Sequence, residues 1–401
     1  MTPAARIACL DLDTFFVSVE RLLDPTLVGV PVVVGGRRGD RGVVTSCSYE
    51  VRPLGVHSGM SLLEAARLAP EAAFVPTRHD TYGAHAARVK AILEQWCPVV
   101  RTASIDEFYL DFAGCERMYS RREDRSDDAT IERTVREMRA AIQVETGLPA
   151  SVGIAAAKAV AKMASGRAKP AGVVMVPAGA ERAFAGPLPV RKLPGIGPVA
   201  EKVLVAAGIR TLGELVLVAD GSGPIAGMAA HLRESLKPSG PLPDRDRPAF
   251  REHDEAAEGS LSNERTFFAA LGREDLVCDA LRSLVERVTW RLRRRGGTAR
   301  TVTVKIRYDD FSTFTRGRSG PPTNAERDVL ALASSLLRGA WDGRRRVRLL
   351  GVQLANLSAA PADGEPAQLP LFPPRPRAGV AIDAVRERFG YEAIRLGVAS
   401  R

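Results

Sequence analysis

The chain opens with a short apolar run that is followed by apolar residues at helical spacing. Residues 6–10 read Arg-Ile-Ala-Cys-Leu, which predicts a buried strand. Apolar side chains then recur along the next stretch, at Phe15, Phe16, Val19, Leu22 and Leu23. This spacing predicts a helix over residues 14–23, with Asp13 or Thr14 as its N-cap.

Predicted strands and helices alternate through the first part of the chain. Short runs rich in Val, Ile and Phe predict strands over residues 31–36, 42–45, 99–102, 108–112 and 150–154. Apolar residues at helical spacing predict helices over residues 60–68, 82–96, 129–146 and 158–168. The alternation indicates a mixed αβ domain.

The pattern changes in the second half of the chain. Residues 187–216 predict a compact helical segment, and the proline-rich residues 236–249 predict a linker. The elements of a second αβ unit are predicted over residues 275–294, 301–308, 325–337 and 346–354. Residues 359–378, rich in proline and alanine, are expected to be disordered, and a last short helix is predicted over 381–389.

Length and composition exclude several classes of protein. A chain of 401 residues is expected to form several domains, and 45% hydrophobic with 26% charged residues is typical of a globular protein rather than a disordered one. No apolar run is long enough to predict a transmembrane helix, and the N-terminus shows no signal peptide. The five cysteines form no CxxC pair, so we expect no disulfide or zinc site and a cytoplasmic location.

The positive charge is concentrated in one region. The net charge is +10, and residues 281–350 contain 16 arginines and one lysine against six acidic residues, which accounts for the whole excess. Such a block is either a solvated face or, as we favour, a surface for a polyanionic partner.

Carboxylates lie at the ends of predicted strands in two places. Asp11 and Asp13 are two residues apart and share a face of an extended strand, whereas Asp106 and Glu107 are adjacent and converge only at a turn. Clustered carboxylates repel one another unless a hard cation neutralises them. Two Mg²⁺ ions held in this way are a common arrangement for nucleotidyl transfer. Taken singly, each of these acids is more commonly a helix cap or a turn residue.

A second group of side chains is suited to holding a phosphate chain. Tyr49 offers a hydroxyl donor, Arg52 a forked guanidinium and Lys169 a point charge. Each of them on its own is more commonly an ordinary surface residue, so their meaning depends on the motifs around them.

Several motifs occur in a fixed order along the chain. They are Asp11-Leu-Asp13-Thr-Phe-Phe16, Ser46-Cys-Ser-Tyr49-Glu-Val-Arg52, Ser104-Ile-Asp106-Glu107, Ser151-Val-Gly-Ile and Ala168-Lys169-Pro170. Together they make residues 5–357 resemble the Y-family translesion DNA polymerases, and among these the bacterial DNA polymerase IV group. The resemblance implies an α+β multidomain fold with a flexible C-terminal tail. The implied domains are a palm over residues 1–20 and 76–175, fingers over 21–75, a thumb with a helix-hairpin-helix over 176–240, an αβ little finger over 250–358 and a tail over 359–401.

The resemblance also assigns roles to the two groups of side chains. Asp11, Asp106 and Glu107, with the carbonyl of Leu12, would hold two Mg²⁺ ions, and Asp13 would be structural. Asp106 and Glu107 would be the catalytic pair. The triphosphate of the incoming dNTP would be held by Tyr49, Arg52 and Lys169.

Phe16 matches the aromatic residue that excludes a ribose 2′-OH by its bulk. We therefore expect it to line the nucleotide site and to select deoxynucleotides. Phe16 could instead be a core aromatic, although Phe15 is the better candidate for the core. Phe108 departs from the family, which often has alanine after the Asp-Glu pair.

DNA contacts are expected in two regions. Residues 193–202 resemble a helix-hairpin-helix, in which Gly195 and Gly197 would let backbone N–H groups approach a DNA phosphate near Lys202. A plain helix–helix turn is the alternative. In the basic αβ unit, side chains expected to face a duplex are Arg293, Arg294, Arg295, Lys305, Arg307 and Arg316. Some of these arginines could instead cap helix and strand ends.

An apolar peptide interrupts the tail. Gln368-Leu369-Pro370-Leu371-Phe372 resembles the peptide with which bacterial polymerases bind the sliding clamp. Leu371 and Phe372 would fill an apolar pocket, and Gln368 would form amide hydrogen bonds. A chance apolar pentamer is the alternative.

These features predict a DNA-templated DNA polymerase of the translesion type that binds primer-template DNA and dNTPs, works as a monomer and is recruited by the sliding clamp. Two other functions are a non-catalytic, clamp-recruited DNA-binding scaffold and a metal-dependent nuclease. The three acidic residues argue against the scaffold. Tyr49, Arg52 and Lys169 argue against the nuclease, which has no triphosphate to hold.

Overall fold

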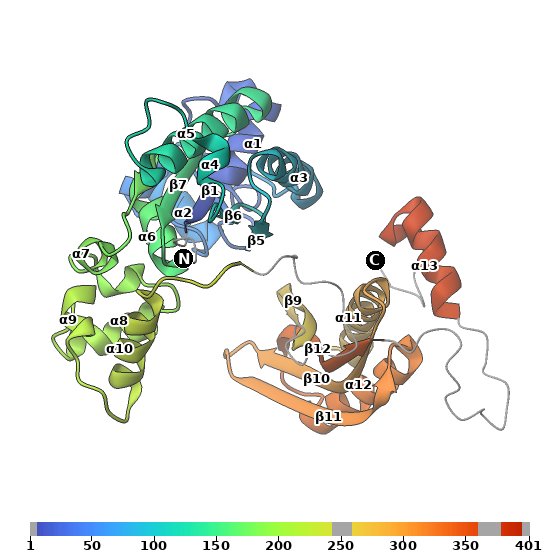
Figure 1. The fold of residues 1–401 in the computed structure, drawn as a ribbon. Helices are drawn as coiled ribbons and strands as arrows, with labels where there is room; N and C mark the ends of the chain where they lie inside the picture. Colours follow the sequence, from blue (N-terminus) through green and yellow to red (C-terminus); the bar gives the residue numbers. More distant parts are fainter. Residues whose placement is uncertain (1–5, 243–258, 360–377, 395–401) are drawn as a thin grey trace, which may run out of the picture. The chain divides into compact units, whose positions relative to one another are not determined.

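The computed structural model describes residues 6–242, 259–359 and 378–394 (Figure 1). The chain divides into two compact units, Met1–Asp246 and Arg247–Arg401. No helix within the described ranges is long and apolar enough to cross a membrane. Four of the five cysteines are free and buried, and Cys278 is free and exposed.

A five-stranded sheet is the centre of the first unit. Its strands, in spatial order, are β5 (Val100–Thr102), β6 (Glu107–Asp111), β1 (Ile7–Leu12), β7 (Ala150–Ala155) and β8 (Val173–Met175). β1 is the middle strand and pairs antiparallel with both β6 and β7. The strands predicted over 6–10, 99–102, 108–112 and 150–154 are confirmed.

Helices cover both faces of this sheet. They are α1 (Phe15–Leu23), α3 (His79–Trp96), α4 (Glu116–Tyr119), α5 (Asp127–Thr146) and α6 (Lys158–Ala168). Leu10 and Phe108 lie in the core shared with α1, α3 and α5, whereas Cys9 and Tyr109 lie in the core shared with α6. The division follows from the alternation of side chains along a strand. The helices predicted over 14–23, 82–96, 129–146 and 158–168 are confirmed.

Thr14, one of the two predicted N-cap residues, is the N-cap of α1, but it does not cap the helix with its side chain. Thr14 adopts a left-handed backbone conformation, with φ 45°, and its side chain forms no capping hydrogen bond. The carboxylate of Asp13 turns toward β7, where it accepts a hydrogen bond from Ser151. The side chain of Asp13 therefore joins two strands instead of capping the helix.

A small sheet follows α1 in the chain. Its strands are β3 (Ser46–Cys47), β2 (Val32–Val34) and β4 (Ala73–Val75), with η1 (Pro25–Leu27), η2 (Tyr49–Leu54) and α2 (Leu62–Leu68) beside them. The strand predicted over 42–45 is wrong, because the regular strand begins at Ser46 and Val43 forms only an isolated bridge with Ser61. Gly42, at the start of that segment, favours a turn over a continuous ladder.

Short helices complete the first unit. They are α7 (Glu181–Ala185), η3 (Val190–Lys192), α8 (Pro198–Ala206), α9 (Leu212–Val216) and α10 (Pro224–Ser235). They pack around Leu193, Leu204 and Leu232. A compact helical segment over 187–216 is confirmed.

The predicted linker is wrong over residues 236–242. The backbone N–H of Ser239 donates to the carbonyl of Ala156 at 2.9 Å, and that of Leu242 donates to Asp111 Oδ2 at 3.0 Å. Leu242 is also buried. These bonds hold the segment on the sheet of the first unit, and residues 243–249 lie outside the described residues.

The second unit is a four-stranded antiparallel sheet with helices. Its strands are β11 (Thr313–Thr323), β10 (Gly297–Tyr308), β12 (Val347–Ala359) and β9 (Ser260–Leu271), and its first helices are α11 (Glu274–Arg294) and α12 (Glu326–Ala340). Val304, Ile306 and Leu350 pack against α11 and α12. The elements predicted over 275–294, 301–308, 325–337 and 346–354 are confirmed.

A last helix, α13 (Ala378–Phe389), is followed by η4 (Tyr391–Ala393) and packs against α11 (Figure 1). Arg293 pairs with Asp383 at 2.6 Å, and the fully buried Arg386 lies 3.4 Å from Glu286. The helix predicted over 381–389 is confirmed. Part of the predicted disordered segment, residues 360–377, lies outside the described residues.

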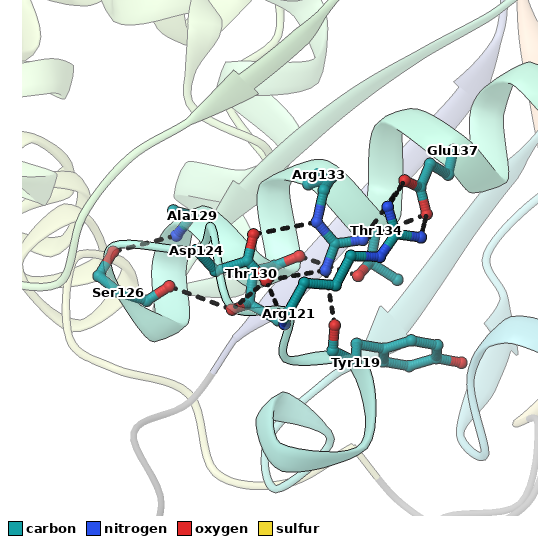
Figure 2. Close-up of polar contacts among 9 residues, drawn as sticks. All are labelled: Tyr119, Arg121, Asp124, Ser126, Ala129, Thr130, Arg133, Thr134 and Glu137. Atoms are coloured by element: carbon teal, nitrogen blue, oxygen red, sulfur yellow. Dashed lines mark hydrogen bonds and ion pairs between the residues drawn. The ribbon is translucent and has the colours of Figure 1, made fainter.

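A cluster of ion pairs ties the turn after α4 to α5 (Figure 2). The guanidinium of Arg133 contacts Asp124 at 2.9 Å and Glu137 at 3.2 Å, and Arg121 contacts Glu137 at 2.9 Å. Arg133 and the N–H of Arg121 hold the pKa of Asp124 well below its usual range. This cluster stabilises α5, which packs against one face of the central sheet.

Candidate active site and nucleic-acid interface

The three candidate metal-binding carboxylates lie at one corner of the central sheet. In the register of β1 and β6, Asp11 lies directly opposite Glu107. Asp106 precedes β6, and its carbonyl accepts a hydrogen bond from the N–H of Leu12 at 2.9 Å. Residues opposite each other in an antiparallel pair point to the same side of the sheet. The strand pairing therefore brings Asp11, Glu107 and the backbone of Leu12 together with Asp106.

Lysines neutralise two of these carboxylates. Lys169 Nζ contacts Asp11 Oδ1, and Lys162 Nζ lies 2.5 Å from Glu107 Oε2. Ser104 Oγ donates to Asp106 at 2.5 Å. Among the described residues, no three His, Cys, Asp or Glu side chains are grouped so that they could hold a metal ion. The carboxylates are thus neighbours that do not converge on one point, and each has a separate partner.

The charges at this corner act on one another. Burial raises the pKa of the Asp11 carboxyl above its ordinary value, and the ammonium of Lys169 opposes this rise. The carboxylates of Asp106 and Glu107 raise the pKa of Asp11 further. Burial and the charge of Glu107 also raise the pKa of Cys9 to about 12. The corner is therefore a site where added positive charge stabilises the ionised carboxylates.

Asp13 joins the parts of the site. Its carboxylate is 1% exposed and accepts hydrogen bonds from Ser151 Oγ at 2.8 Å, the N–H of Ala171 at 2.7 Å and the hydroxyl of Tyr49 at 3.1 Å. Lys169 Nζ lies 3.9 Å from it. These are the contacts of a structural carboxylate that holds β1, β7 and η2 together.

The candidate triphosphate-binding residues lie next to this carboxylate. The guanidinium of Arg52 lies over the ring of Tyr49, 4.4 Å from its centroid, and Arg52 follows Tyr49 by one turn of η2. Tyr49 and Lys169 both contact Asp13. Burial, followed by the charge of Asp13, raises the pKa of Tyr49, so its hydroxyl keeps its proton as a donor. The structure thus brings Tyr49, Arg52 and Lys169 together beside Asp11.

Phe16 and Phe15 differ in their surroundings. Phe15 is buried in the core, whereas Phe16 is half-buried and stacks on Tyr82 with ring centroids 4.1 Å apart. The hydroxyl of Tyr82 donates to the buried Glu20 at 2.6 Å, which fixes the ring beneath Phe16. Phe108 is a core residue.

Two residues of this site were not predicted from the sequence. Lys162 pairs with Glu107, and Tyr82 supports Phe16. Lys162 could have been suspected, since it is a basic residue on the predicted helix 158–168, which leads directly to Lys169. Nothing in the sequence indicates which aromatic residue of α3 meets Phe16.

The glycine turn before α8 has the backbone that a helix-hairpin-helix requires. Gly195 adopts φ 97°, a region that favours glycine, and Gly197 precedes the first residue of α8. Lys202 is exposed on α8. The imidazole of His231 lies 3.1 Å from the carbonyl of Pro194 and ties the turn to α10.

Three of the basic side chains expected to face a duplex lie on the sheet of the second unit, and they differ in the face from which they start. Lys305 and Arg307 alternate with Val304 and Ile306 and so lie on the face of the sheet away from α11 and α12. Arg316 lies opposite Val304 in the register, so its side chain starts from the helix-covered face at the edge strand. These three side chains therefore do not start from one face of the sheet, and their contact with a duplex stays a prediction.

The arginines at the end of α11 differ from one another. Arg293 forms two hydrogen bonds to Asp383, at 2.6 and 2.9 Å, and its side chain is mostly buried. Its guanidinium therefore joins α11 to α13. Arg294 is exposed and lies over the ring of Trp290 at 5.1 Å, and Arg295 is the C-cap of the helix. Gln368, Leu369, Leu371 and Phe372 lie outside the described residues.

Comparisons with known proteins cover nearly the whole chain. Residues 10–166 match the model of the impB/mucB/samB family, and residues 258–371 match the C-terminal domain of that family. The chain is 35% identical over 402 residues to a DNA polymerase IV of Dehalococcoides mccartyi, which covers 98% of this chain and 97% of the relative. It is 36% identical to a DNA polymerase IV of Alkalilimnicola ehrlichii, with 92% and 99% covered.

Solved structures of similar fold span both units. A Y-family DNA polymerase chimera of Dbh and Dpo4 has a TM-score of 0.71 and 25% identity, and covers 88% of this chain and 99% of its own. DinB from Sulfolobus solfataricus has a TM-score of 0.56 and 25% identity over the same shares. From its relatives, its fold and the carboxylate corner between β1 and β6, we conclude that this chain belongs to the Y family of translesion polymerases, whose members carry out DNA-directed, divalent-metal-dependent DNA synthesis.

Proposed function

We propose that Asp11, Asp106 and Glu107, with the carbonyl of Leu12, hold two Mg²⁺ ions when the polymerase joins a dNTP to a primer 3′ end. The observation that carries the proposal is the register that places Asp11 opposite Glu107 and the backbone of Leu12 beside Asp106. All four groups offer oxygen, the donor that Mg²⁺ prefers. Bound ions of this kind stabilise the charge that develops on the attacking and leaving oxygens.

The lysines at the corner support this proposal. Lys169 and Lys162 supply positive charge to Asp11 and Glu107 in the structure. Lys169 would exchange Asp11 for a phosphate oxygen of the dNTP when that carboxylate is held by a bound cation. Both lysines thus hold the acidic corner together until substrate is bound.

The nucleotide is oriented by the side chains next to Asp13. Tyr49 and Arg52 would donate to the triphosphate from η2, where the stacked ring and guanidinium keep each other in place. Phe16, whose ring stacks on that of Tyr82, would occupy the space of a ribose 2′-OH. This arrangement selects deoxynucleotides by bulk and does not read the base.

Primer extension with purified protein tests the proposal. With a primed template, dNTPs and Mg²⁺, we expect lengthened primers. Unchanged primers would favour the scaffold, and shortened primers would favour the nuclease. Asp106→Asn should abolish extension and weaken Mn²⁺ binding measured by electron paramagnetic resonance, while DNA affinity is kept. Glu94→Gln, an exposed acid on α3, is the matched control. Unchanged Mn²⁺ binding by Asp106→Asn would contradict the metal assignment.

We also propose that the protein works as a monomer in the cytoplasm and is recruited by the sliding clamp through Gln368–Phe372. The peptide carries three large apolar side chains, Leu369, Leu371 and Phe372, in a polar segment, which favours docking on an apolar pocket. Five free cysteines are in keeping with a reducing compartment.

A further inference from the structure

The turn between β10 and β11 displays aromatic rings and guanidinium groups together. We call this group the hairpin platform, and its members are Tyr308, Phe311, Phe314, Arg345 and Arg348. Phe311 is 62% exposed and Phe314 is 40% exposed. Arg348 lies 4.6 Å from the ring centroid of Phe311, and Arg345 lies 3.8 Å from that of Tyr308 and 5.9 Å from that of Phe314. Phe311 and Phe314 therefore offer exposed ring surface beside guanidinium groups, whereas Tyr308 is buried and lies under Arg345.

The turn holds Phe311 in an unusual conformation. Its φ is 64°, in the left-handed region that bulky side chains rarely adopt. The N–H of Phe311 donates to the carbonyl of Tyr308 at 3.0 Å, and the N–H of Tyr308 donates to the carbonyl of Ser312 at 2.9 Å. Glycine or asparagine would fit such a turn with less strain. A strained and exposed aromatic residue indicates that the ring has a role outside the fold.

A second set of bonds makes the platform rigid before any partner arrives. Arg345 Nη2 donates to Asp310 Oδ2 at 2.6 Å, and Asp310 Oδ1 accepts from the N–H of Ser312 at 2.9 Å. The carbonyl of Arg345 accepts from the indole N–H of Trp341 at 2.9 Å. The turn is therefore fixed to the segment between α12 and β12, and little conformational entropy is lost when the rings bind a partner.

The chemistry of the platform favours an unpaired nucleobase. Exposed rings beside guanidinium groups are the combination that binds single-stranded nucleic acid, because bases stack on the rings and phosphates pair with the arginines. Residues 344–348 alone contain four arginines. A polymerase acts on a template whose strand ahead of the primer is single-stranded, so such bases are present whenever the enzyme works.

We propose that the hairpin platform binds an unpaired base of the template overhang by stacking on Phe311, with Arg348 at the adjoining phosphate. The inference rests on the polymerase function proposed above, and it adds a binding site outside the active site. It concerns the single-stranded part of the DNA, in contrast to the duplex contacts expected of Lys305 and Arg307.

Binding of the full-length chain to two fluorescent DNAs tests the proposal. One is a primer-template with a single-stranded 5′ overhang, and the other is its blunt duplex. The test variant is Phe311→Asn, because asparagine suits the left-handed turn and removes the ring. Phe311→Tyr keeps a ring. Phe389→Ala is the matched control, since Phe389 is 65% exposed and lies under Arg388 at 5.2 Å.

Phe311→Asn should weaken binding of the overhang DNA by about five-fold or more, the loss of one stacked base. Affinity for the blunt duplex should not change, and Phe311→Tyr and Phe389→Ala should bind both DNAs as the wild type does. An overhang of abasic nucleotides should remove the difference between wild type and Phe311→Asn. The proposal is overturned if Phe311→Asn binds the overhang as tightly as Phe389→Ala, or if it loses as much affinity for the blunt duplex. Failure of the wild type to extend the primer would instead overturn the proposed function.

Discussion

Asp13 offers a sharp test of how the site is held together. It is buried, and its carboxylate accepts from Ser151, from the N–H of Ala171 and from the hydroxyl of Tyr49. Asp13→Asn keeps the shape of the side chain but replaces one acceptor oxygen by an NH₂ donor. The change therefore tests the hydrogen bonds and the charge without opening a cavity.

The structure sets the size of the effect. The N–H of Ala171 can only donate, so the amide oxygen must face it and the NH₂ group must face Tyr49. Tyr49 then has to turn its own proton away and accept. Bonds to a carboxylate become bonds to a neutral amide, and the attraction to Lys169 at 3.9 Å is lost. The difference between charged and neutral hydrogen bonds predicts a loss of about 1–2 kcal/mol.

Two measurements check this prediction. Hydrogen exchange should show that the free energy needed to expose the β1 and β7 amides falls by this amount, about 1–2 kcal/mol. In primer extension the KM for dNTP should rise more than kcat falls, because Tyr49 and Lys169 are displaced while the carboxylate corner stays in place. The matched control is Asp24→Asn, an exposed acid whose two hydrogen bonds both come from Thr26, two residues along the chain. If Asp13→Asn has the same amide hydrogen exchange and the same KM for dNTP as Asp24→Asn, Asp13 does not organise the site.

Three further predictions concern selectivity, pH and recruitment. Phe16→Ala should lower discrimination against ribonucleotides by about 10- to 200-fold in single-nucleotide kinetics with dCTP and CTP, while dCTP incorporation is largely kept. Burial and the nearby Glu286 raise the pKa of Glu326 to about 7. Since this folded-state pKa lies above the ordinary value, the second unit should lose stability as pH rises from about 5 to about 7. Thermal unfolding of Glu326→Gln should lack that slope. Replacing Leu371 and Phe372 by Ala should abolish clamp binding in a pull-down, because two buried apolar side chains contribute about 1.5–3 kcal/mol each, and should leave unassisted synthesis unchanged. A variant that still binds the clamp would show that the peptide is not the contact.

The sequence by itself determined the elements that carry the site. The apolar run before Asp11 and the helical spacing over 158–168 predicted β1 and α6, because side chains repeat differently in strands and helices. The positions of Asp11, Asp106 and Tyr49 at the ends of such elements follow from the same local pattern. That pattern alone left each of them as a common cap, turn or surface residue, and it was the order of the motifs, which resembles the Y-family polymerases, that identified them as a site.

Only the tertiary structure decided which side chains meet. Lys162 faces Glu107, Arg293 is taken up by Asp383 ninety residues away, and Arg316 starts from the helix-covered face. Sequence spacing places a side chain on one face of its own helix or strand. Its partner depends on strand register and on which helix packs against which, since both are set by the burial of apolar surface over the whole unit. The neighbours in space thus decided that Lys162 pairs with a carboxylate of the candidate active site and that Arg293 joins two helices.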